Sequence, residues 1–95
     1  MRVHPEAARE ARAARRWYSE YSKDAGERFV AAYRQAVKVI ADSPARWPSY
    51  LGARRYHMRR FPYSVIFDVA ADGVVEILAV THDRRGPGYW RRRSL

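Results

Sequence analysis

The 95-residue sequence contains no cysteine, which excludes disulfide bonds and thiolate metal sites. Its three histidines, His4, His57 and His82, lack the spacing of a metal-binding motif such as HxxxH. The glycines at Gly86 and Gly88 are not followed by a helical pattern or a lysine, as a phosphate-binding loop requires. We therefore expect neither a metal ion nor any other cofactor.

Long apolar runs are also absent. No stretch approaches the roughly 20 apolar residues that a membrane span needs. The first residues, Met1 to Pro5, lead directly into a charged segment and lack the apolar core of a secretory signal. We therefore expect a cytoplasmic protein without membrane contacts.

Acidic residues are few, with 10 Asp and Glu against 19 Lys and Arg, and the formal net charge is +9. Seventeen of the basic residues are arginine, and they are locally concentrated between residues 83 and 93. Such a charge attracts polyanions, and the candidate partners are nucleic acid, the ribosome or an acidic protein. A genome rich in arginine codons would give the same count.

The apolar fraction of 47% is sufficient for one modest core, and the length fits a single domain over residues 1–95. Residues 5–21 have helical periodicity, and Pro5 suits a first helical turn. The apolar stripe of this segment consists of Ala7, Ala11, Ala14, Tyr18 and Tyr21.

A second helix follows a short connection at Ser22-Lys23. Asp24 is placed as its N-cap, with Glu27 as the capping-box partner three residues later, and Ser43-Pro44 ends it. Its apolar stripe is led by Phe29, Tyr33, Val37 and Ile40. The two segments predict an αα-hairpin.

The second half of the chain has the period of β-strands, with strands expected over residues 54–60, 63–70 and 74–81. Asp72-Gly73 predicts a hairpin with a type I′ turn. We expect a further short edge strand at Arg2-Val3. Helices followed by strands favour an α+β fold in which the helical hairpin packs on a small antiparallel sheet.

Strand alternation places Arg55, His57 and Arg59 on one face of the first strand, and His82 on the polar side of the last. Cleavage of RNA by its 2′-hydroxyl needs a base, an acid and cations that stabilise the phosphorane. Arginine, histidine and tyrosine can supply these roles. The candidate catalytic residues are Arg55, His57, His82, Arg84, Arg85 and Tyr89.

Each candidate also has a structural interpretation. His57 on an exposed strand face is as consistent with a solvated residue. Tyr89 and Trp90 are as consistent with a clamp over the sheet as with a functional contact. We expect Arg91 to Arg93 to be a solvated tail or a contact to the partner protein and to polyanions.

Four segments occur in an order and spacing that resemble the RelE/ParE toxin family. They are HPEA before an alanine-rich helix, RFxxAY in the second helix, RRFPYSVIFDV at residues 59–69 and ILAVTHDRRGPGYW at residues 77–90. The resemblance implies a toxin that is neutralised by a cognate antitoxin protein. We expect that antitoxin to be acidic and to be encoded by an adjacent gene.

The resemblance leaves the target open, because some members cut mRNA on the ribosome and others poison DNA gyrase on nearly the same fold. Ribosome-dependent mRNA cleavage is the first hypothesis, and non-enzymatic inhibition of gyrase is the alternative. A plain nucleic-acid-binding domain rests on charge alone. Cleaving members have an arginine directly after a middle-strand tyrosine, whereas here Ser64 follows Tyr63.

Overall fold

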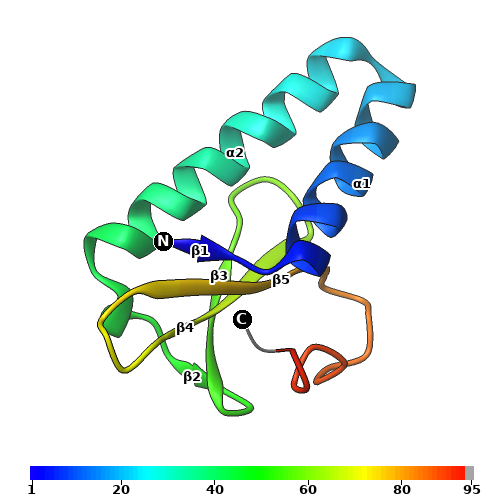
Figure 1. Cartoon of the computed structure of the whole chain (residues 1–95). Helices are drawn as coiled ribbons and strands as arrows, with labels where there is room; N and C mark the ends of the chain where they lie inside the picture. The colour runs from blue at the N-terminus through cyan, green and yellow to red at the C-terminus, as the bar shows by residue number, and fades with distance from the viewer. Residues whose placement is uncertain (94–95) are drawn as a thin grey trace.

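The computed structural model describes residues 1–93, and it is an α+β fold with two helices and a five-stranded mixed sheet (Figure 1). The elements are β1 (Arg2–Val3), α1 (Pro5–Tyr21), α2 (Lys23–Asp42), a 3₁₀ turn (Pro44–Arg46), β2 (Ser49–Tyr50), β3 (Ala53–His57), β4 (Tyr63–Val69) and β5 (Val75–His82). The strand order is β1-β5-β4-β3-β2. The α+β class and the short first strand are confirmed. The sheet is mixed because β1 pairs with β5 in parallel.

The helical hairpin covers one face of the sheet (Figure 1). The core between them contains Phe29 and Ile40 of α2 against Phe67 and Ile77 of the sheet, all at most 1% exposed. The helices approach closely at Gly26, where an added Cβ would lie 2.0 Å from the Ser19 hydroxyl oxygen. None of the helices described for residues 1–93 has the length and apolar character needed to cross a bilayer.

The opposite face of the sheet is covered by the C-terminal segment. Trp90, only 2% exposed, packs there with Ile66, Leu78 and Ala79. Tyr50 of β2 lies beside it, with the two ring centroids 6.1 Å apart. The expectation of a clamp over the sheet therefore holds for Trp90, whereas the β2 strand was not expected.

The start of α2 differs from the sequence prediction. Ser22 is the only residue between the helices, and its hydroxyl oxygen accepts a hydrogen bond from the Ala25 amide at 3.0 Å. The N-cap is thus Ser22, and the capping box of Asp24 with Glu27 is wrong. Tyr21, predicted on the apolar stripe of α1, is 86% exposed.

The β4–β5 hairpin is confirmed, but its turn is of another type. Only Gly73 has a positive φ, of 83°, whereas a type I′ turn needs a second positive φ at Asp72. The Gly73 amide donates to the Ala70 carbonyl at 2.8 Å, and the Ala70 amide donates to the Val74 carbonyl at 2.9 Å. This is a three-residue loop closed by a left-handed glycine.

A β-bulge in β5 changes which side chains share a face. Ile66 pairs with Ala79 and Phe67 pairs with Ile77, so Leu78 is the extra residue. Beyond the bulge, alternation is reversed, and His82 packs against Tyr63 on the helical side, with ring centroids 5.1 Å apart. The prediction that His82 lies on the polar side of the last strand is therefore wrong, and His82 does not share a face with Arg55 and His57.

The first predicted strand is also shorter than expected. β3 ends at His57, and Arg59 and Arg60 form the turn to β4, where Arg60 has a φ of 67°. Arg59 therefore does not belong to the face that carries Arg55 and His57.

We predict that Ser22→Ala lowers the free energy of unfolding by about 1 kcal/mol, because the Ala25 amide loses its acceptor. Asp24→Ala is the control, since Asp24 makes an exposed ion pair with Arg28, a contact worth only about 0.3–0.5 kcal/mol. Urea denaturation of both variants measures the difference. A larger loss of unfolding free energy for Asp24→Ala than for Ser22→Ala would instead support the capping box that the sequence predicted.

Candidate functional site

One polar cluster lies on the sheet face that is not covered by the helices. The side chains of Arg55 and His57 come from β3, Ser64 comes from β4, and Asp83 follows β5. The Arg55 Nη2 lies 2.6 Å from the His57 Nε2, and the His57 Nδ1 lies 2.9 Å from the Ser64 Oγ. Ser64 donates in turn to the Asp83 Oδ1 at 2.7 Å. We call these four residues the sheet-face cluster.

Burial and stacking hold the sheet-face cluster in place. Ser64 is 1% exposed, and its hydroxyl has partners on both sides. The Arg55 guanidinium lies over the Tyr50 ring at 4.4 Å, which is cation–π geometry. The Asp83 amide donates to the Pro62 carbonyl at 2.8 Å, which fixes the segment after β5.

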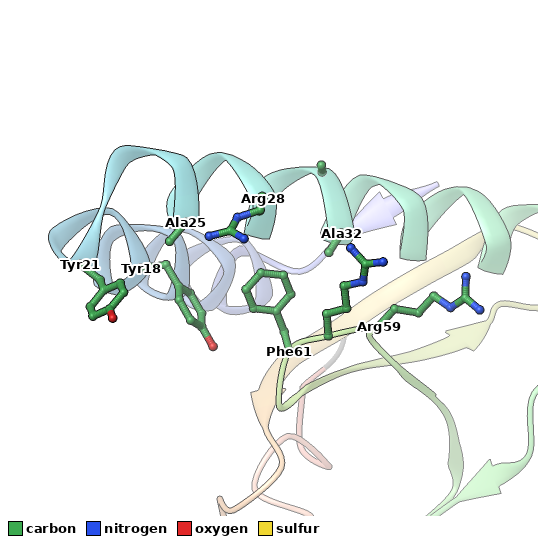
Figure 2. A pocket seen from close by; sticks show the side chains of 9 residues that line it. Tyr18, Tyr21, Ala25, Arg28, Ala32, Arg59 and Phe61 are labelled. Carbon is green, nitrogen blue, oxygen red and sulfur yellow. The ribbon is translucent and has the colours of Figure 1, made fainter.

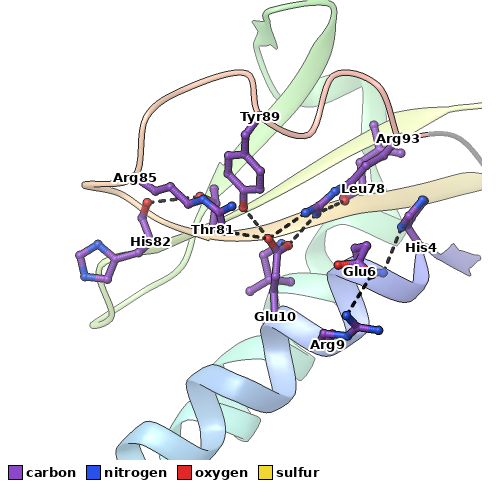
Figure 3. Close-up of polar contacts among 11 residues, drawn as sticks. His4, Glu6, Arg9, Glu10, Leu78, Thr81, His82, Arg85, Tyr89 and Arg93 are labelled. Carbon is purple, nitrogen blue, oxygen red and sulfur yellow. Dashed lines mark hydrogen bonds and ion pairs between the residues drawn. The ribbon is translucent and has the colours of Figure 1, made fainter.

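A second polar cluster centres on Glu10 of α1, toward which Tyr89, Arg85 and Arg93 converge in Figure 3. The Glu10 carboxylate accepts from the Tyr89 hydroxyl at 2.7 Å and from Arg93 at 2.8 and 3.1 Å. It also accepts from the Val80 amide at 3.0 Å. The Arg85 guanidinium pairs with it at 3.4 Å and lies 3.5 Å from the centroid of the Tyr89 ring.

The contacts around Glu10, which we call the Glu10 cluster, favour the ionised form of its carboxyl group. Burial raises the pKa of Glu10, but hydrogen bonds from Arg93, Tyr89 and the Val80 amide outweigh that cost, so its pKa lies below the usual value. Burial and the nearby carboxylate raise the pKa of Tyr89. The Tyr89 hydroxyl is therefore held as a donor to Glu10.

The predicted catalytic residues are divided among these environments. Arg55 and His57 lie together, as predicted. His82 lies on the other face, and its Nδ1 accepts from the Arg84 amide at 3.1 Å. Arg85 and Tyr89 are bound to Glu10. The structure thus brings Arg55 and His57 together in the sheet-face cluster and Arg85 and Tyr89 together at Glu10.

Sequence reasoning missed Glu10, Arg93 and Asp83. Glu10 lies three residues after Ala7 and four before Ala14, on the stripe of α1 that faces the core. A carboxylate at such a position needs a partner, which was the available signal. The partnership of Asp83 with Ser64 joins residues 19 positions apart and left no such signal.

A groove of about 970 Å³ runs between α2 and the β3–β4 turn. In Figure 2, Phe61 and Arg59 extend from this turn toward α2. The groove has small residues along α2 and arginines on both sides; its lining is Tyr18, Tyr21, Ala25, Arg28, Ala31, Ala32, Arg59, Arg60 and Phe61. We call it the hairpin groove. Within residues 1–93, no three His, Asp or Glu side chains gather closely enough to hold a metal ion.

The helical hairpin on a five-stranded mixed sheet defines a small basic protein with the fold of RelE/ParE-like toxins. Residues 1–87 match the family model of the ParE toxin of the type II toxin–antitoxin system parDE. The chain therefore belongs to this toxin family, as the sequence segments indicated, and the family implies a cognate antitoxin. A search of curated proteins found no match.

We predict that Glu10→Gln lowers the free energy of unfolding at neutral pH by about 2 kcal/mol, because charge-assisted hydrogen bonds to Arg93 and Tyr89 are weakened. The folded-state pKa of Glu10 is lowered, so its stabilisation is complete above the unfolded pKa and is lost as the pH falls through the folded pKa.

Denaturation of wild type and variant across acidic pH checks this expectation, and the two curves should converge at low pH. The control is Glu20→Gln, an exposed glutamate on the same helix. A constant difference down to low pH would contradict the ionic role of Glu10.

Proposed function

We propose that this type II toxin arrests growth by binding DNA gyrase rather than by cleaving RNA. The observation that carries the proposal is the division of the six candidate catalytic residues. Arg85 and Tyr89 already have a structural partner in Glu10, and His82 is on the helical side of the sheet. A catalytic centre needs its groups to converge on one reacting atom.

The middle strand supports the same target. Ser64 occupies the position directly after Tyr63, where the cleaving members that the sequence resembles have an arginine. Ser64 is buried and hydrogen-bonded to His57 and Asp83, so this position of the middle strand supplies no cationic side chain. The matching family model is that of the ParE toxin, and ParE-like members are the ones that the resemblance associates with gyrase.

Ribosome-dependent mRNA cleavage is the second candidate function, and one observation favours it. Arg55 and His57 form a close pair on the sheet face away from the helices, and the His57 side chain is 56% exposed. A cation beside an imidazole is suited to a phosphate ester.

Induction of the toxin in a bacterial host, with DNA and protein synthesis pulse-labelled separately, tests the choice between these targets. We predict that DNA synthesis stops first, and that purified toxin traps DNA cleavage complexes of gyrase. The Arg55→Ala, His57→Ala double variant should retain toxicity. An early collapse of protein labelling that this variant abolishes would instead establish RNA cleavage.

The antitoxin is the expected partner, and the hairpin groove fits an acidic amphipathic segment. Its alanines allow a helix to approach closely, and Arg28, Arg59 and Arg60 provide positive charge along its sides. Association of such a segment would bury apolar surface and pair opposite charges.

We predict that Arg28→Glu weakens binding of the acidic protein encoded by the adjacent gene at least about tenfold, or about 1.4 kcal/mol. Arg34→Glu is the matched control, since it makes the same charge change on α2 outside the groove. Calorimetric titration compares the two variants. Equal losses would mean that net charge, and not the groove, determines binding.

A further inference from the structure

The sheet-face cluster contains a cation that is not paired with a carboxylate. Among the ion pairs of residues 1–93, none includes Arg55. Its guanidinium instead contacts the His57 Nε2 and the Tyr50 ring. A guanidinium has five N–H donors, so most of its capacity to bind an anion remains free.

The hydrogen bonds determine which nitrogen of His57 carries the proton. Arginine can only donate, so the His57 Nε2 at 2.6 Å from Arg55 must be the acceptor. The proton of the neutral ring is then on Nδ1, which donates to the Ser64 Oγ. The Ser64 hydroxyl donates its own hydrogen bond to the Asp83 carboxylate, which can only accept when ionised.

The other two histidines have the opposite arrangement. The His4 Nδ1 accepts from the Glu6 amide at 3.1 Å, and the His82 Nδ1 accepts from the Arg84 amide at 3.1 Å. Both rings must therefore carry their proton on Nε2 when neutral. His57 is thus distinguished from the other histidines by its partners in the sheet-face cluster.

We propose that the sheet-face cluster is a binding site for a phosphate-type anion, in which Ser64 and Asp83 are positioning residues that hold His57 as its Nδ1–H tautomer. Arg55 covers the basic Nε2 nitrogen of His57 in the free protein. An anion that binds Arg55 draws the guanidinium away and exposes that nitrogen. This inference goes beyond the proposed target, because RNA and DNA both carry phosphate esters.

The tautomer is tested by ¹⁵N NMR of the purified full chain, at a pH where the imidazoles are neutral. We expect the His57 signals to have the Nδ1–H pattern, and the His4 and His82 signals in the same spectrum to have the Nε2–H pattern. An Nε2–H pattern for His57 would overturn the proposal.

Variants separate positioning from simple packing, and they are made in the Arg55→Ala background because the Arg55 donor favours the same tautomer. There Ser64→Ala should remove the tautomer preference of His57, whereas Thr81→Ala, which removes a hydroxyl from the residue paired with Ser64, should leave it intact. Asp83→Asn should preserve the preference in part, because its amide oxygen still accepts from Ser64. An unchanged His57 pattern in the Arg55→Ala, Ser64→Ala double variant, with the other signals at their wild-type positions, would overturn the positioning role.

The anion is tested by titration with inorganic phosphate and with single-stranded RNA and DNA oligonucleotides of equal sequence. Phosphate should shift the Arg55 Nε and His57 Nε2 signals, and Arg55→Ala should abolish the response while His57 keeps its tautomer. A stronger response to one oligonucleotide identifies the source of the phosphate ester. Unchanged Arg55 signals with all three probes would overturn the anion site. None of these readouts depends on toxicity, so they remain valid if gyrase is not the target.

Discussion

The carboxylate of Glu10 connects the three parts of this small fold. β1 pairs with β5 only at Glu76 and Ile77, so the rest of this edge of β5 has no neighbouring strand. Edge strands with unpaired backbone groups are sites of unwanted association. Here the Val80 amide donates to Glu10, and the Leu78 carbonyl accepts from Arg93. Because Arg93 also binds Glu10, one ion pair joins the helix, the sheet edge and the C-terminal segment.

The periodicity of the chain was sufficient to predict its two helices and its longer strands, because each face must be buried against another layer. It predicted the helical hairpin, the three main strands and the short first strand. Local details were decided by contacts that periodicity does not describe. Ser22 and Asp24 are both good N-caps, and the single-residue connection between the helices selects Ser22. At Asp72-Gly73, the loop has three residues instead of two, so only Gly73 needs a positive φ.

The candidate site was harder to predict for a similar reason. Residues 77–80 are all apolar, so no change from apolar to polar marks the bulge at Leu78. That one extra residue moved His82 to the other face, since alternation reverses beyond it. Arg55 and His57 were placed correctly because β3 has no bulge within its pairing to β4. Their partner Asp83 lies in the segment after β5, where strand alternation no longer applies.

The arrangement of the β3–β4 hairpin relates the two surfaces to which we assign binding. His57 ends β3 in the sheet-face cluster, and Arg59 and Arg60 of the next turn line the hairpin groove. Arg60 adopts a φ of 67°, which is unfavourable for a residue other than glycine and persists where its surroundings hold it. The turn is closed by the Met58 amide, which donates to the Tyr63 carbonyl at 2.9 Å. His57 of the sheet-face cluster and Arg59 and Arg60 of the hairpin groove are therefore at most three residues apart, and one closed turn positions both surfaces.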